Sequence, residues 1–160
     1  MIGLEAENIL YIQLEYLLRI AIACVLGTAI GHERRNRNKS AGIRTHAIVA
    51  MGSALMMIVS KYGFADVADY DAFRVAAQIV SGVGFLGAGM IFVRNNLVNG
   101  LTTAAGIWAT AGIGMAIGAG LYLISIGAAV MIIIAQEITH RVSFFAHAAS
   151  GGSLRLTLVQ

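Results

Sequence analysis

Apolar residues occupy five long stretches of this 160-residue chain, and the polar residues are gathered in short connections between them. The stretches cover residues 14–31, 45–62, 75–93, 103–119 and 121–138. Each is close to the ~20 residues that an α-helix needs to cross the core of a bilayer. The last two would together overshoot any membrane, so a turn is expected near Gly120. The pattern predicts an all-α integral membrane protein, a compact bundle of about five transmembrane helices.

Composition strengthens this prediction and suggests how the helices pack. The chain is 58% hydrophobic and 12% charged, whereas soluble domains carry about 25% charged residues. It has nineteen glycines and no proline, and small residues let helix backbones approach closely in lipid. We expect the third and fourth helices to cross tightly, or to form a homodimer or larger homo-oligomer. The expected contact faces are Gly82, Gly84, Gly87 and Gly89 on the third helix, and Gly114 and Gly118 on the fourth.

The distribution of charge predicts the orientation in the membrane. The connection 31–46 carries five of the eleven basic residues, namely Arg34, Arg35, Arg37, Lys39 and Arg44. Such connections stay on the cytoplasmic side, which places the N-terminus outside and the C-terminus in the cytoplasm. The five tyrosines then fall at the outer interface (Tyr11, Tyr16, Tyr62, Tyr70 and Tyr122). Basic residues gathered in one connection favour lipid headgroups over nucleic acid as the partner.

A polar cluster is expected on the cytoplasmic face. Glu33 is the lone acid of the cationic connection, and the second and fourth helices begin on the same side. Helix N-termini attract anions, so they could hold Glu33 itself, a lipid phosphate or a carboxylate of a partner. Ser40, Thr102 or Thr103 would cap these helices. The candidate residues are Glu33, Arg34, Ser40, Arg44, Thr45, Thr102 and Thr103.

A second set of polar residues lies toward the outer side. Glu15 and Arg19 are four residues apart, the favourable order for a helical ion pair. Arg19 either pairs and snorkels or lines a pathway. Arg74 and Gln78 have the same spacing, and we expect them to mark the inner face of the third helix.

The sequence gives little sign of catalysis or of a metal. It has neither a phosphate-binding loop nor a nucleophile–base pair, so we expect no enzymatic activity. Asp66, Asp69 and Asp71 are weak candidates for Mg²⁺ because their spacing matches no recognised loop. Asp71 fits equally well as a helix cap, and no cofactor is expected.

The chain also divides by composition near its end. Residues 1–145 make up the predicted membrane domain. Residues 146–160 contain a Ser-Gly-Gly-Ser stretch followed by alternating polar and apolar positions. This pattern predicts a linker and the possible start of a truncated cytoplasmic domain.

Four separated motifs stand in this order: GHERR at 31–35, KSAGIRTH at 39–46, RVAAQIVSGVGFLGAG at 74–89 and GLTTAA at 100–105. Together they resemble the MgtC/SapB family of bacterial inner-membrane proteins. The resemblance implies a multi-pass inner-membrane domain of four or five helices, often followed by a small ACT-like cytoplasmic domain. It also implies a link to growth in low magnesium and, in pathogens, to virulence. One branch of the family restrains the proton-driven ATP synthase by binding it.

Two functions remain open from the sequence. One is a non-enzymatic regulator that acts through protein–protein contacts in Mg²⁺ or phosphate homeostasis. The other is a small transporter or channel for Mg²⁺ or another ion, working as an oligomer. The second, fourth and fifth stretches contain no charge at mid-depth, whereas transporters usually need polar groups there. This favours the regulator; a lipid-binding scaffold is compatible with both.

Overall fold

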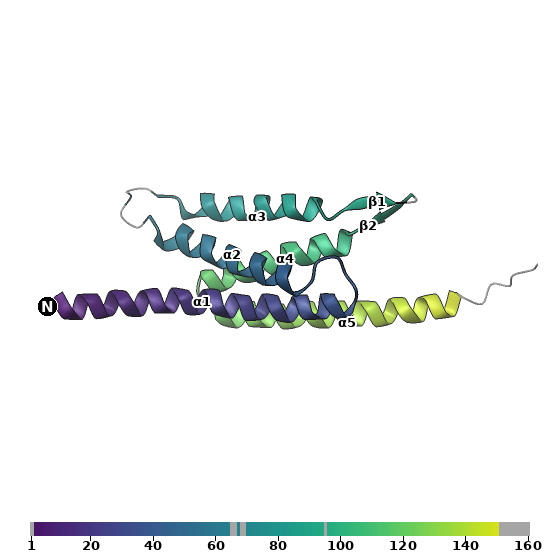
Figure 1. Cartoon of the computed structure of the whole chain (residues 1–160), viewed down its shortest axis with the longest axis horizontal. Helices are drawn as coiled ribbons and strands as arrows, with labels where there is room; N and C mark the ends of the chain where they lie inside the picture. The colour runs from purple at the N-terminus through teal and green to yellow at the C-terminus, as the bar shows by residue number, and fades with distance from the viewer. Residues whose placement is uncertain (1, 65–66, 68–69, 95, 151–160) are drawn as a thin grey trace, which may run out of the picture.

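The computed structural model describes residues 2–64, 67, 70–94 and 96–150. These residues form five helices and one hairpin (Figure 1). The helices are α1 (Ile2–Asn36), α2 (Ile43–Tyr62), α3 (Ala72–Ala88), α4 (Leu101–Gly118) and α5 (Tyr122–Ser150). Between α3 and α4, β1 (Phe92–Arg94) pairs antiparallel with β2 (Leu97–Asn99).

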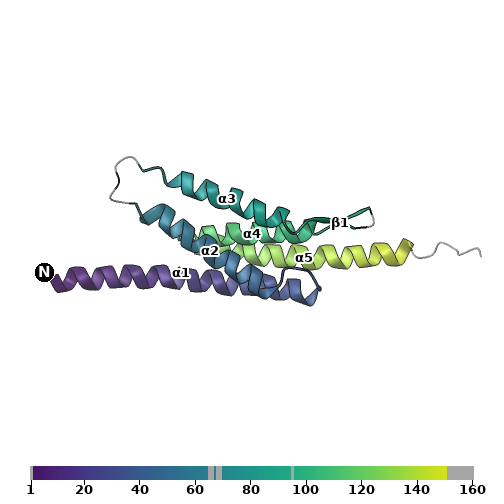
Figure 2. The ribbon, with the colours of Figure 1, turned by 45° about the horizontal axis from the view of Figure 1, so that its top comes forward.

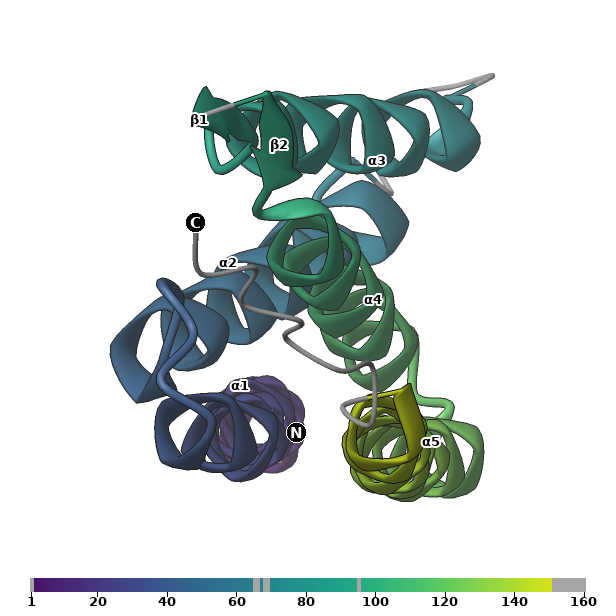
Figure 3. The same cartoon turned by 90° about the vertical axis from the view of Figure 1, so that its right-hand side faces the viewer.

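The helices run alternately in opposite directions, α1, α3 and α5 one way and α2 and α4 the other (Figures 1 and 2). Seen end-on in Figure 3, α1 and α5 form one layer, α2 and α4 the next, and α3 the outermost. One end of the molecule, which we call the arginine end, therefore contains the connection from α1 to α2, the hairpin and the start of α4. The opposite end, which we call the tyrosine end, contains the ends of α2 and α4 and the start of α5.

Four helical segments are long and apolar enough to cross a membrane: Glu7–Asn36, Ile43–Tyr62, Leu101–Gly118 and Tyr122–Arg141. The expected membrane helices at 14–31, 45–62, 103–119 and 121–138 correspond to these four. Helix α3 has 17 residues and is shorter than they are. Whether α3 crosses the bilayer, and which end faces the cytoplasm, stay predictions.

The helix predicted at residues 75–93 ends earlier than expected. The segment 75–93 was expected to be helical throughout, but α3 ends at Ala88 and residues 92–94 form a strand. Asn96 has φ +61°, a left-handed conformation that asparagine tolerates better than most residues. Adjacent asparagines between two short β-prone runs are typical of a hairpin, a local signal that outweighs the apolar pattern.

The tightest helix contacts join α2 to α4 and to α1. A Cβ added to Gly118 would lie 2.5 Å from the carbonyl oxygen of Ala54, and one added to Gly27 would lie 2.5 Å from that of His46. At Gly114 the carbonyl oxygen of Ala50 is closer still. Because the neighbouring atoms are backbone, these helices could not approach so closely with any larger residue.

The third and fourth helices pack together, but not through the two glycine faces that were expected, and the alternative of a homo-oligomer stays a prediction. Gly114 and Gly118 face α2, while Gly82 and Gly84 of α3 have no atom within 4 Å of an added Cβ. Gly87 faces Ala104 of α4 at an ordinary 3.5 Å. Small size alone does not indicate which neighbour a helix face meets.

Two of the three predicted helix starts need correction. The residues that precede α2 and α4 are Gly42 and Gly100, with no side-chain cap. Thr102 and Thr103 already lie inside α4, so they cannot cap it. Asp71, by contrast, does cap α3, because its Oδ1 accepts a hydrogen bond from the backbone N–H of Phe73 at 2.9 Å. The turn expected near Gly120 is also confirmed, with φ +90° at that glycine.

Both outer helices are longer than predicted. Helix α1 continues through Gly31 to Asn36, so Glu33 and Arg34 lie on its last turns and not in a loop. Helix α5 continues to Ser150, so positions 146–150 of the expected linker are helical. Residues 151–160 lie outside the described residues, and the further domain stays a prediction.

Candidate functional site: a polar network at the arginine end

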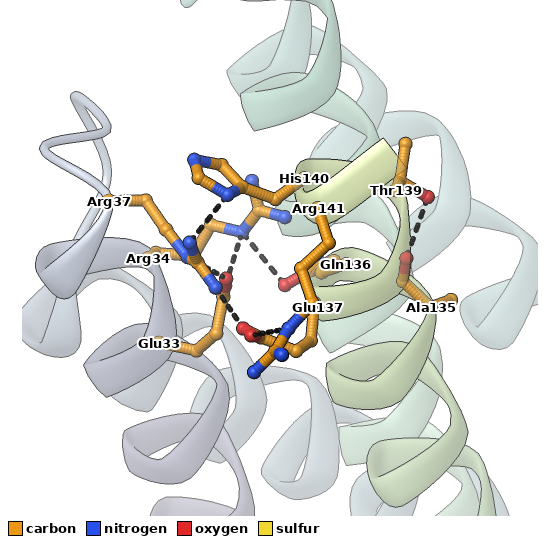
Figure 4. A network of polar contacts seen from close by, with 9 residues as sticks. All are labelled: Glu33, Arg34, Arg37, Ala135, Gln136, Glu137, Thr139, His140 and Arg141. Atoms are coloured by element: carbon orange, nitrogen blue, oxygen red, sulfur yellow. Dashed lines mark hydrogen bonds and ion pairs between the residues drawn. The ribbon is translucent and has the colours of Figure 1, made fainter. Parts of the chain in front are cut away.

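The end of α1 and the second half of α5 place their polar side chains against each other at the arginine end (Figure 4). Helical spacing explains the arrangement, since residues four apart share a face. Glu33 and Arg37 are four apart, as are Gln136 and His140. Two short polar stripes, one at the end of α1 and one on α5, therefore meet where the apolar parts of the two helices end.

Arg37 joins the two stripes. Its Nε donates to Glu33 Oε1 at 3.3 Å, Nη1 donates to Nδ1 of His140 at 2.7 Å, and Nη2 donates to Glu137. An arginine can only donate, so Nδ1 of His140 accepts in this arrangement. Glu137 also pairs with Arg141 at 2.8 Å.

Arg34 is the most deeply buried charge of the network, with 3% of its surface exposed. Its Nε donates to Oε1 of Gln136 at 2.9 Å and lies 3.2 Å from Oε2 of Glu33. Among the described residues, neither Nη1 nor Nη2 has a hydrogen-bond partner, and the dashed lines at Arg34 in Figure 4 end on Nε. The buried side-chain atoms at this end that lack a partner among the described residues are instead Oε2 of Glu33 and Nε2 of His46.

His46 of α2 lies beneath the same network. It is fully buried, with Nδ1 3.0 Å from the carbonyl oxygen of Gly42 and Nε2 unpaired among the described atoms. A Cβ on Gly106 of α4 would lie 3.6 Å from Nε2 of His46, 3.9 Å from Nε2 of Gln136 and 4.0 Å from Nε of Arg34. Polar groups from three helices thus surround this glycine.

A partly open cavity of about 340 Å³ lies between these side chains. We call it the arginine chamber. Its walls are Glu33, Arg34, Arg37 and Lys39, Thr102 at the start of α4, and the face of α5 formed by Ala135, Gln136, Thr139 and His140. Three cationic side chains against one carboxylate leave this lining with an excess of positive charge.

The opposite end also contains a buried arginine, but one in which all three side-chain nitrogens donate hydrogen bonds. Arg19 pairs with Glu15, as the sequence predicts, and donates to the hydroxyls of Tyr62 at 3.1 Å and Tyr122 at 3.0 Å. It also donates to the carbonyl oxygen of Gly118 at 2.9 Å. Its guanidinium carbon lies 5.4 Å from the ring centre of Tyr16 and 5.4 Å from that of Tyr62, a cation–π distance.

The structure brings together only part of the cytoplasmic cluster expected from the sequence. Glu33, Arg34 and Thr102 line the arginine chamber, and Thr103 is buried nearby in α4. Ser40, Arg44 and Thr45 are exposed. Arg44 and Thr45 line a different hollow with Arg35, so their inclusion in the cluster was wrong. The first residues of α2 turn toward this second hollow while His46, one half-turn later, points inward.

The outer candidates are also corrected in part. Arg74 and Gln78 are exposed, so they do not mark an inner face of α3. Gln78 borders an apolar groove between α2 and α3. Among the described residues, no group of three or more His, Cys, Asp or Glu side chains could hold a metal. Asp66 and Asp69 lie outside the described residues, and Asp71 caps α3.

Sequence reasoning missed the contribution of α5. Gln136, Glu137, Thr139 and His140 were not among the candidates, and Arg37 and Lys39 were assigned to orientation and headgroups. A signal existed, because Glu33–Arg37 and Glu137–Arg141 are both pairs at four-residue spacing where an apolar stretch ends. The spacing does not reveal that the two pairs face each other.

Comparison with known proteins places the chain in a family. The MgtC family model matches residues 20–145. A protein of Escherichia coli K12 named putative magnesium transporter YhiD is 53% identical over 135 residues, which is 81% of this chain and 63% of that protein. SapB of Bacillus subtilis is 41% identical, with 79% of this chain and 57% of SapB covered. MgtC of Salmonella typhimurium is 43% identical, with 76% and 51% covered.

No solved structure matches the chain. The chain spans less than two thirds of the length of these relatives. The family match nevertheless covers most of the described helices, from within α1 to within α5. The chain belongs to the MgtC family.

Proposed function

We propose that this protein is a non-enzymatic regulator that binds another protein in the bacterial inner membrane and supports magnesium or phosphate homeostasis. The supporting observation is the separation of its polar groups. The polar network around Arg34 and Arg37 lies at the arginine end, and the tyrosines around Arg19 lie at the tyrosine end. Between the two ends, the backbones of α1, α2 and α4 pack closely at Gly27, Gly114 and Gly118. Thr110 and Ser125, both buried, donate to nearby carbonyl oxygens, that of Gly106 in α4 and that of Leu121 just before α5.

This arrangement leaves little room for an ion path through one copy of the chain. A permeating cation needs a continuous series of polar or charged groups across the membrane. The second candidate, an ion transporter, is favoured by the name of the YhiD relative. It would require a path between copies of the chain in an oligomer.

A flux assay separates the two candidates. The purified protein is reconstituted in liposomes that contain a fluorescent Mg²⁺ indicator, and Glu33→Ala serves as the comparison. The regulator predicts the same Mg²⁺ influx as in protein-free liposomes. Influx that depends on the protein and is abolished by Glu33→Ala would overturn the proposal.

The partner is tested separately, starting with the proton-driven ATP synthase that the family resemblance implies. ATP-driven proton pumping is measured in inverted membrane vesicles with and without this protein. We expect slower pumping with the wild-type protein, and recovery with Arg44→Glu, which reverses an exposed charge at the arginine end. Arg74→Glu makes the same change at the opposite end and is the control. Equal pumping with and without the wild-type protein would exclude this partner.

A further inference from the structure

We propose that the arginine chamber binds a phosphate group, held by the terminal nitrogens of Arg34 together with Lys39 and the start of α4. The proposal concerns binding to the isolated protein and does not depend on the regulatory function. It rests on the unpaired donors of Arg34, on the charge of the lining and on the backbone at the entrance.

The first argument is the guanidinium of Arg34. Arg34 is 3% exposed, and it lines the chamber with Nη1 and Nη2 unpaired among the described residues. A guanidinium presents N–H groups in a planar fork that matches the oxygens of a phosphate or carboxylate. The terminal nitrogens of Arg34 are therefore free to donate to an anion in the chamber, although the buried side-chain atom of the lining that lacks a partner is Oε2 of Glu33.

The second argument is the charge that surrounds this anion. The chamber is lined by Arg34, Arg37 and Lys39 against the single carboxylate of Glu33. Arg37 is already shared between Glu33 and Glu137 on the side of α5. No ion pair to Lys39 occurs among the described residues. The charged side chains of the lining sum to +2, and to +1 when Glu137, the second partner of Arg37, is included, so the chamber favours an anion in either case.

The third argument is the start of α4. Thr102 lines the chamber on the first turn of this 18-residue helix. Gly100 precedes the helix without a side-chain cap, and no capping side chain blocks the first N–H groups. Unpaired N–H groups and the helix dipole favour phosphate at such a position. The helix start supports the assignment, but the unpaired arginine carries it.

Two sources could supply the phosphate group, a lipid headgroup or free phosphate. A volume of about 340 Å³ accommodates either, and the chemistry of recognition is the same. The experiment therefore contains one arm for each source.

The test is the thermal unfolding midpoint of the protein in dodecyl maltoside, purified without phosphate. One arm titrates inorganic phosphate against chloride at equal ionic strength. The other adds dioleoylphosphatidic acid to the micelles, with dioleoylglycerol as the matched lipid that lacks the phosphate. We expect a saturable rise of the midpoint with at least one phosphate probe. A response to inorganic phosphate alone assigns free phosphate, and a response to the lipid alone assigns the headgroup.

Variants connect the response to the chamber. Arg34→Gln should abolish it, and because this variant removes a buried charge, Lys39→Gln and Thr102→Val are measured as well. We expect Lys39→Gln to weaken the apparent affinity by about tenfold, the loss of one charged contact. Arg94→Gln removes an exposed charge from the hairpin at the same end and should bind as the wild type does. No response to either probe, or equal losses in Lys39→Gln and Arg94→Gln, would overturn the proposal.

Discussion

Each end of the molecule buries one arginine of α1, and the two differ in how completely their N–H groups are bonded. Arg19 is 7% exposed and Arg34 is 3% exposed. All three nitrogens of Arg19 donate, to Glu15, Tyr62, Tyr122 and the carbonyl oxygen of Gly118. Among the described residues, Arg34 is bonded only through Nε. The two arginines are similarly buried, but of these two only Arg34 has terminal nitrogens without a hydrogen-bond partner among the described residues.

The comparison teaches how to separate a structural charge from a binding charge. Burial of an arginine inside a membrane helix suggests function in both cases. At the tyrosine end this suggestion fails, because hydroxyls and a carbonyl from three helices satisfy the guanidinium. At the arginine end, Arg34 lines a cavity, and its two terminal nitrogens have no hydrogen-bond partner among the described residues. The number of hydrogen bonds that each guanidinium donates therefore distinguishes Arg19 from Arg34, whereas their burial does not.

The first prediction concerns the packing that holds both ends in place. Gly114→Leu should lower the free energy of unfolding by about 3 kcal/mol or more, because the added side chain meets the backbone of Ala50, which cannot move aside. Gly112→Leu, on the exposed face of the same helix with open space at its Cβ, is the control. Denaturant titration in detergent micelles measures both. Similar losses in the two variants would show that the α2–α4 contact does not fix the ends.

The second prediction tests the comparison directly. Arg19→Met should cost on the order of 2–3 kcal/mol, since it removes several hydrogen bonds to a charged group. The cost stays below that of a fully buried ion pair because the Glu15 side chain is 48% exposed and regains water. Arg34→Met should cost on the order of 1–2 kcal/mol in phosphate-free buffer, since it removes one bond to Gln136 and one ion pair to Glu33, whose side chain is 12% exposed but keeps Arg37 as a partner. Equal costs would remove the distinction between the two ends.

How far the sequence predicts these two ends can now be argued from particular residues. The Glu15–Arg19 pair and the tyrosines follow from local spacing and from interfacial preference, and three of those tyrosines do meet at Arg19. Glu33 and Arg34 were recognised as candidates, but their partner Gln136 is 102 positions from Arg34 along the chain. Periodicity predicts a helix and its apolar face. It does not predict which polar turn of one helix meets which turn of another.

The glycines and the hairpin show the same limit in the packing. Glycine content correctly indicates close helix contacts, but the choice of α2 over α3 as the neighbour of Gly114 depends on complementary backbone surfaces. The apolar run 75–93 contains both a helix and a strand because hydropathy alone does not separate them. Asn96 marks the turn only when it is considered with its β-prone neighbours.

The third prediction measures one bond of the tyrosine end. Tyr122→Phe removes the hydroxyl that accepts from Nε of Arg19 at 3.0 Å, and should lower the free energy of unfolding by about 1 kcal/mol. Nε keeps its bond to Glu15 at 3.2 Å, which limits the loss. Tyr11→Phe changes a tyrosine that is 71% exposed and should have no measurable effect. A Tyr122→Phe loss as small as that of Tyr11→Phe would mean that Arg19 does not depend on the hydroxyls around it.

The smallest expected effect separates the centre of the arginine network from its rim. The side chain of Arg141 is 72% exposed and pairs with Glu137, so water and salt screen the interaction. Arg141→Gln should change the free energy of unfolding by less than about 0.5 kcal/mol. Arg37→Gln should cost about 1 kcal/mol, because the side chain of Arg37 is 21% exposed and bridges Glu33 and Glu137. High salt should reduce the Arg141 effect further. A larger loss for Arg141 than for Arg37 would place the centre of the network on α5, away from the chamber, and so weaken the contrast between Arg34 and Arg19.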